Sequence, residues 1–96
     1  MASFNISIEL RNNTEAVYQE LNEKMNSHGF KHCLLDEDGA YYRLPRGEFT
    51  YSDYVCRQEI LDKVYEVLFE INPCPKVVVT EVAGRAWRGL EKIDLS

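Results

Sequence analysis

Two short segments of the chain each combine aromatic rings with a pair of arginines spaced three residues apart. In chain order they contain Tyr41, Tyr42, Arg43 and Arg46, and then Arg85, Trp87 and Arg88. Arginines bind phosphate groups and aromatic rings stack on bases, so this combination is typical of proteins that bind single-stranded nucleic acid. The same residue types are favoured at protein–protein interfaces. The alternative is that the rings pack a small core or a dimer interface, while the arginines pair with acidic side chains.

Glu9 is a candidate general base, because it lies in an alternating segment, FNISIEL at 4–10, whose polar residues should share the open face of a strand. A carboxylate there could take a proton or hold a metal ion, although polar residues on a solvated sheet face are common. The sequence has no Ser–His–Asp, Cys–His or glycine-rich phosphate motif. A metal-free ribonuclease needs only arginines and a base, so Glu9, Arg43 and Arg46 are the candidate catalytic residues.

No metal site or cofactor is predicted. The segment DEDG at 36–39 resembles part of a calcium loop, but Leu34 and Pro45 stand where that loop needs acidic ligands. A tight turn is the better interpretation of these four residues. His28 and His32 are four residues apart, but the glycine between them should end the helix, so they would not share a helical face.

Composition predicts one small domain, residues 1–96 with a C-terminal tail at 84–96. The net charge of −5 excludes nucleic-acid binding through the overall electrostatic field of the protein, so any RNA contact needs a local basic patch. A protein partner fits the acidity equally well.

The odd number of widely spaced cysteines, Cys33, Cys56 and Cys74, favours a reducing cytoplasm over a disulfide framework. No long apolar run or leader peptide is evident. Small domains bury little surface, so a homodimer is also expected.

Hydropathy patterns predict an α+β domain. Alternation and β-branched runs indicate strands at 4–10, 30–35, 48–52 and 76–82, the last of them well buried. Apolar residues three and four apart indicate a helix from about 14 to 28, and a second from a cap at Ser52 or Asp53 to Asn72. This order gives a ferredoxin-like βαββαβ sandwich, with a four-stranded antiparallel sheet and both helices on one face.

The chain resembles the GhoS family of type V antitoxins over residues 4–72. The resemblance rests on the strand ISIEL at 6–10, Met25, Phe30, the turn Asp36-Glu37-x-Gly39, Leu44, Phe49 and Glu59-Ile60. GhoS is similar in fold to the small ferredoxin-like endoribonucleases associated with CRISPR adaptation. The resemblance implies an endoribonuclease that cleaves the messenger RNA of a small membrane toxin, without forming an antitoxin–toxin protein complex.

The resemblance also implies where the site residues should lie. Glu9 stands where the CRISPR-associated family has an aspartate at the end of the first strand. The arginines of the antitoxin's first helix are replaced here by Glu20 and Asn22. Basic groups for RNA would therefore come from the two arginine-containing segments, with Tyr41, Tyr42 and Trp87 stacking on bases.

Two hypotheses follow from the sequence. The first is a GhoS-like cytoplasmic protein that binds or cleaves single-stranded RNA. The second is a non-enzymatic protein of a phage or mobile element that binds and inhibits a host protein through a sheet edge or through the arm at 41–47.

Overall fold

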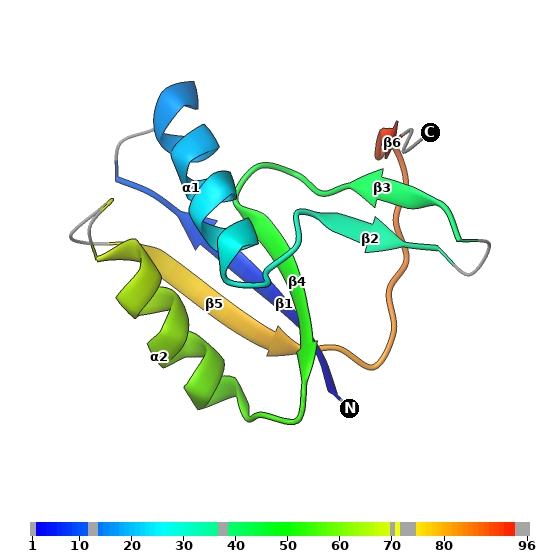
Figure 1. Ribbon diagram of the computed structural model, residues 1–96. Helices are drawn as coiled ribbons and strands as arrows, with labels where there is room; N and C mark the ends of the chain where they lie inside the picture. Colours follow the sequence, from blue (N-terminus) through cyan, green and yellow to red (C-terminus); the bar gives the residue numbers. More distant parts are fainter. Residues whose placement is uncertain (1, 12–13, 37–38, 70, 72–74, 94–96) are drawn as a thin grey trace.

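The computed structural model describes residues 2–11, 14–36, 39–69, 71 and 75–93, and these form an α+β fold (Figure 1). In chain order its elements are β1 (Ala2–Glu9), α1 (Glu15–Ser27), β2 (Cys33–Leu35), β3 (Tyr41–Arg43), β4 (Glu48–Asp53), α2 (Arg57–Leu68), β5 (Lys76–Glu81) and β6 (Lys92–Ile93). Within these residues the strands form two antiparallel sheets of three strands each, ordered β4-β1-β5 and β2-β3-β6.

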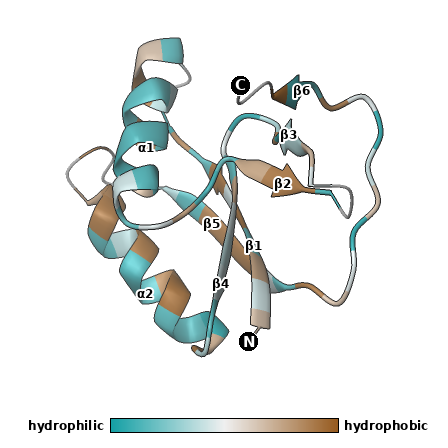
Figure 2. Ribbon diagram, turned by 45° about the vertical axis from the view of Figure 1, so that its right-hand side comes forward, coloured by the Kyte–Doolittle hydropathy of each residue, from teal (hydrophilic) through white to brown (hydrophobic). Residues whose placement is uncertain are grey.

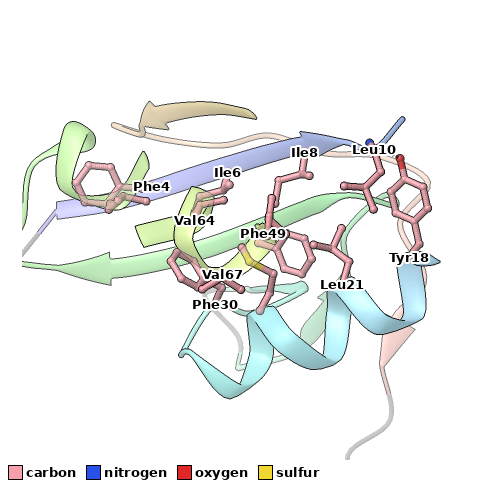
Figure 3. Close-up of a cluster of buried hydrophobic side chains, with 13 residues drawn as sticks. Phe4, Ile6, Ile8, Leu10, Tyr18, Leu21, Phe30, Phe49, Val64 and Val67 are labelled. Carbon is pink, nitrogen blue, oxygen red and sulfur yellow. Dashed lines mark hydrogen bonds between the residues drawn. The ribbon is translucent and has the colours of Figure 1, made fainter. Parts of the chain in front are cut away.

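The first sheet buries one face and leaves the other open, as the alternation in β1 predicts. Ile6 lies opposite Phe49 on β4 and Val79 on β5, and all three face the helices. Phe4, Ile6 and Ile8 of β1 are almost fully buried and pack with side chains from both helices into one core (Figure 3). Asn5, Ser7 and Glu9 alternate with the core residues, so they lie on the opposite face.

Helix α1 begins and ends close to the predicted positions. Thr14 caps it by accepting a hydrogen bond from the amide of Val17 at 3.4 Å. Helix α2 begins later than predicted, at Arg57 after an N-cap at Cys56. The expected caps fail because Ser52 and Asp53 still pair with β1 as the last residues of β4. The predicted end at Asn72 lies outside the described residues.

The prediction of a single four-stranded sheet is wrong for the described residues. Among the described residues, the predicted second strand, 30–35, forms backbone pairing with the first sheet only at one isolated bridge, from Lys31 to Thr50. The chain then turns away and pairs with β3, so β2 belongs to the second sheet. In Figure 2 the helices lie on one side of β1, β4 and β5, and β2, β3 and β6 lie on the other.

Two side chains explain why the ladder stops at this bridge. The next hydrogen-bonded pair would join Cys33 to Glu48, two residues beyond Lys31 and Thr50 on their strands. Instead the Thr50 hydroxyl donates to the Cys33 carbonyl at 3.0 Å, and Nδ1 of His32 bonds the Glu48 carbonyl at 2.8 Å. Both carbonyls are thus satisfied by side chains, so the strand departs without leaving them unpaired.

The second sheet contains structure that the sequence patterns did not predict. The turn at Asp36 is present, with its amide bonded to the Ala40 carbonyl at 2.7 Å; Glu37 and Asp38 lie outside the described residues. The extended segment after this turn forms a separate strand, β3. The C-terminal tail returns to pair Tyr41 with Ile93 and Tyr42 with Lys92.

Strand β5 is an edge strand and not the well-buried strand predicted. Among the described residues it pairs only with β1, and Val78, on the open face, is 62% exposed. Its valines on the other face pack against the core, so the apolar run reflects burial of one face only. Among the described residues, the helices are too short or too polar to cross a membrane.

Candidate functional site

The tail crosses the open face of the first sheet and is held there by Arg85. Its guanidinium donates from Nε and Nη2 to Oδ1 of Asn5, at 3.0 and 2.8 Å. Asn5 lies in the middle of β1, between Thr50 of β4 and Thr80 of β5. Two N–H groups of one planar fork thus fix the tail over the centre of a polar sheet face.

Arg85 remains a cation with donors to spare. Partial burial lowers the pKa of its guanidinium from the ordinary value, but arginine stays protonated near neutral pH. Among the described residues no carboxylate lies within ion-pair distance of Arg85, and its partner Asn5 is neutral. The donors that do not bond Asn5 can therefore bind an anion above the sheet.

A groove runs between the tail, the open sheet face and the arm after β3. We call it the tail groove; its volume is about 430 Å³ and its lining includes Asn5, Leu34, Leu44, Pro45, Glu48, Arg85, Trp87 and Arg88. The second arginine-containing segment thus contributes both of its arginines and its ring to one concave surface. Glu48 is the acidic residue in this lining.

Trp87 packs against a neighbouring ring and also lines the tail groove. Its ring lies 5.8 Å from the ring of Tyr42, tilted by 52°, so it packs the tail against β3. It is also 37% exposed and lines the tail groove. The ring is therefore held in place by one aromatic neighbour while part of it stays accessible to a stacking base.

Tyr41 lies in a smaller hollow next to the tail groove. This hollow of about 210 Å³ is also lined by Lys31, Ser52 and Arg85. Arg85 therefore borders both hollows, and Lys31 adds a second cation near it. The structure thus gathers Tyr41, Arg85, Trp87 and Arg88 around one stretch of the tail, with Tyr42 behind Trp87.

The candidate catalytic residues gather less closely. Arg46 stacks on the Tyr18 ring, with 4.2 Å from Cζ to the ring centroid, and lines a hollow of about 450 Å³ with Glu9. Arg43 lines a different hollow, which it shares with Arg46, and pairs with Glu91 at 3.8 Å. The three residues therefore do not converge on one point, because Arg46 lies between the other two.

His32 is a candidate site residue that the sequence does not reveal, because its spacing from His28 suggests only a metal ligand. It lies where the chain leaves the first sheet, tilted against Phe49 with 5.4 Å between ring centroids. It lines the same hollow as Arg43 and Arg46. No sequence pattern marks it, since its place depends on the departure of β2. Within the described residues no group of three or more His, Cys, Asp or Glu side chains could hold a metal ion.

Comparison with known proteins identifies no relative: neither a family model nor a curated protein matches the chain.

Proposed function

We propose that this protein binds single-stranded RNA in the tail groove. The observation that carries the proposal is Arg85, a cation without a described carboxylate partner, fixed over a polar sheet face beside an accessible tryptophan. A phosphate would bind the spare donors of Arg85 and the guanidinium of Arg88, and a base would stack on Trp87. A net charge of −5 makes such binding local, so it should involve few phosphates and depend weakly on salt.

The biological target in this proposal comes from the resemblance to GhoS. The protein would be a cytoplasmic type V antitoxin, and its RNA would be the message of a small membrane toxin. The strand order β4-β1-β5 is that of the third, first and fourth strands of a ferredoxin-like sheet, so the described residues retain this part of the expected fold. Binding to the message would suffice to block its translation, and cleavage would make the block irreversible.

Arg85→Ala tests the groove. Wild-type protein and the variant are titrated into a fluorescein-labelled single-stranded RNA, and binding is followed by anisotropy. Losing one charge-assisted phosphate contact should weaken binding by roughly ten- to a hundredfold. Arg57→Ala is the matched control, because Arg57 is an exposed arginine at the start of α2, outside the lining of the tail groove. Equal affinity of the wild type and Arg85→Ala would refute the groove as the RNA site.

A second candidate function, binding to a host protein, is favoured by the edge of β5. The residues between the two charged ends of this strand are all β-branched and uncharged, and Val78 among them is exposed. Such an edge can accept a strand from a partner or from a second copy of the chain. A stoichiometric complex with one host protein that survives ribonuclease treatment would favour this function, whereas RNA that co-purifies with the domain would favour the tail groove.

A further inference from the structure

His32 lies in a second concave site, formed where the two sheets separate. We call it the hairpin pocket; its volume is about 430 Å³ and its lining includes Tyr18, Asn22, His32, Arg43, Leu44 and Arg46. The amide of Leu44 donates to the His32 carbonyl at 3.1 Å, which holds the histidine beside the chain segment that carries both arginines. Leu44 lines the tail groove as well, so the two sites adjoin.

The hydrogen bond to Glu48 fixes the tautomer of His32. A carbonyl oxygen can only accept, so Nδ1 must carry the proton in its 2.8 Å bond to the Glu48 carbonyl. In the neutral ring Nε2 then bears a lone pair, and among the described residues it has no partner. The ring is also held by its contact with Phe49, so His32 has a fixed position in the lining of the pocket.

The remaining lining residues suit a ribose and a phosphate. Arg46 stacks on Tyr18, which is nearly fully buried and whose hydroxyl accepts a bond from the Leu10 amide at 3.1 Å, so the platform is rigid. The ion pair of Arg43 with Glu91 is 3.8 Å long between side chains that are 59% and 78% exposed, so a phosphate can readily replace the carboxylate. Oδ1 of Asn22, from the same lining, is buried and has no hydrogen-bond partner among the described residues.

We propose that the hairpin pocket cleaves the RNA that the tail groove binds, with His32 as the general base. Nε2 takes the proton of a ribose 2′-hydroxyl, and the 2′-oxygen forms a bond to the adjacent phosphorus. The bond from phosphorus to the 5′-oxygen of the next nucleotide breaks, and that oxygen takes a proton from water. Arg43 and Arg46 stabilise the charge on the phosphoryl oxygens.

The products of this step are a 2′,3′-cyclic phosphate and a 5′-hydroxyl, and His32 returns its proton to solvent. The step needs no metal ion and no co-reactant beyond water. It also assigns the base to His32 in place of Glu9, which lines a neighbouring hollow with Arg46 but does not line the hairpin pocket. The inference rests on the proposed RNA binding, and it makes the protein an endoribonuclease.

His32→Asn is the decisive variant. The asparagine amide can still donate to the Glu48 carbonyl from about the position of Nδ1, but it offers no base in place of Nε2. A 5′-labelled single-stranded RNA is incubated with protein in EDTA, and its cleavage rate and Kd are measured separately. We expect cleavage to fall at least about a hundredfold, with Kd unchanged within about twofold. His28→Asn is the matched control, because His28 is an exposed histidine at the end of α1.

Product chemistry gives a second readout. Wild-type protein should yield 3′ ends that resist phosphatase until mild acid opens the cyclic phosphate, and it should bind but not cut RNA with 2′-O-methyl groups. Cleavage by His32→Asn at the wild-type rate, or products with 5′-phosphates, would overturn the inference. RNA binding without cleavage would overturn it too and leave the proposed function standing, whereas absence of RNA binding would overturn both.

Discussion

Gly47 offers a sharp test of the packing that supports both sites. It follows Arg46 and precedes β4, has a φ of +83°, and accepts a hydrogen bond from the Ile8 amide at 2.7 Å. A Cβ at this position would overlap the Ile8 carbonyl oxygen and come within 3.4 Å of the Tyr18 ring. The turn therefore needs glycine for two reasons, its left-handed backbone and the close approach of β1.

The expected cost of Gly47→Ala is the sum of two effects. An L-residue in the left-handed region costs about 1–2 kcal/mol. Displacing a backbone carbonyl from a packed strand adds about 1–3 kcal/mol. The total of about 2–5 kcal/mol is a large fraction of the roughly 5–15 kcal/mol by which a domain of this size is stable. Because Arg46 is the preceding residue, the platform on Tyr18 should be disturbed as well.

Gly39→Ala separates the two effects. Gly39 has nearly the same φ, +84°, but a Cβ there would meet nothing within 4 Å. Its variant should lose only the conformational contribution, about 1–2 kcal/mol. Urea unfolding followed by circular dichroism gives both free energies of unfolding, and their difference isolates the overlap with Ile8. Equal losses in the two variants would refute the close approach of this turn to β1.

Two further substitutions test the bonds that position the sites. Asn5→Asp should place a carboxylate against the guanidinium of Arg85. The new ion pair should slow hydrogen exchange in the tail, and it should weaken RNA binding several-fold because it neutralises the cation. Unchanged RNA affinity would contradict a role for the positive charge of Arg85 in binding. Thr50→Val should leave the Cys33 carbonyl without its hydroxyl donor, at a cost of about 1–3 kcal/mol in the free energy of unfolding. Thr50→Ser keeps a hydroxyl and should lose much less of this free energy. Equal losses in the two variants would show that the hydroxyl does not replace the backbone hydrogen bond to Cys33.

The elements with strong periodicity were predictable from the sequence. Strand β1 alternates without interruption, and α1 has both an apolar stripe and a capping threonine, so local pattern and tertiary burial agree there. The start of α2 was predicted too early, since β4 pairing extends to Asp53 and overrides its capping preference. The valine run of β5 predicts a well-buried strand, because a run of this length does not reveal whether one face of the strand or both are covered.

The second sheet could not be predicted, because it depends on two side-chain hydrogen bonds between segments far apart in the sequence. Nothing local marks Thr50 as the partner of the Cys33 carbonyl, or His32 as the partner of the Glu48 carbonyl. The same limit applies to the candidate sites. The arginine-containing segments were visible in the sequence, but their separation into the tail groove and the hairpin pocket follows from the path of the tail.

The hydrogen bonds that end the first sheet also create the hairpin pocket. If the ladder continued past Lys31, the backbone amide of Cys33 would bond the Glu48 carbonyl, and His32 would lose the partner that sets its tautomer. The departure of β2 therefore places His32 in the lining of a pocket that also contains Arg43 and Arg46. An acidic chain can in this way gather cations in two adjoining sites. In the proposed complex, the RNA would contact Arg85 and Arg88 in the tail groove and His32 in the hairpin pocket, on the other side of Leu44. A double variant, Thr50→Val with His32→Ala, should then lose more stability than the sum of the single changes, because each native side chain satisfies one carbonyl of the same missing pair and neither replacement can do so.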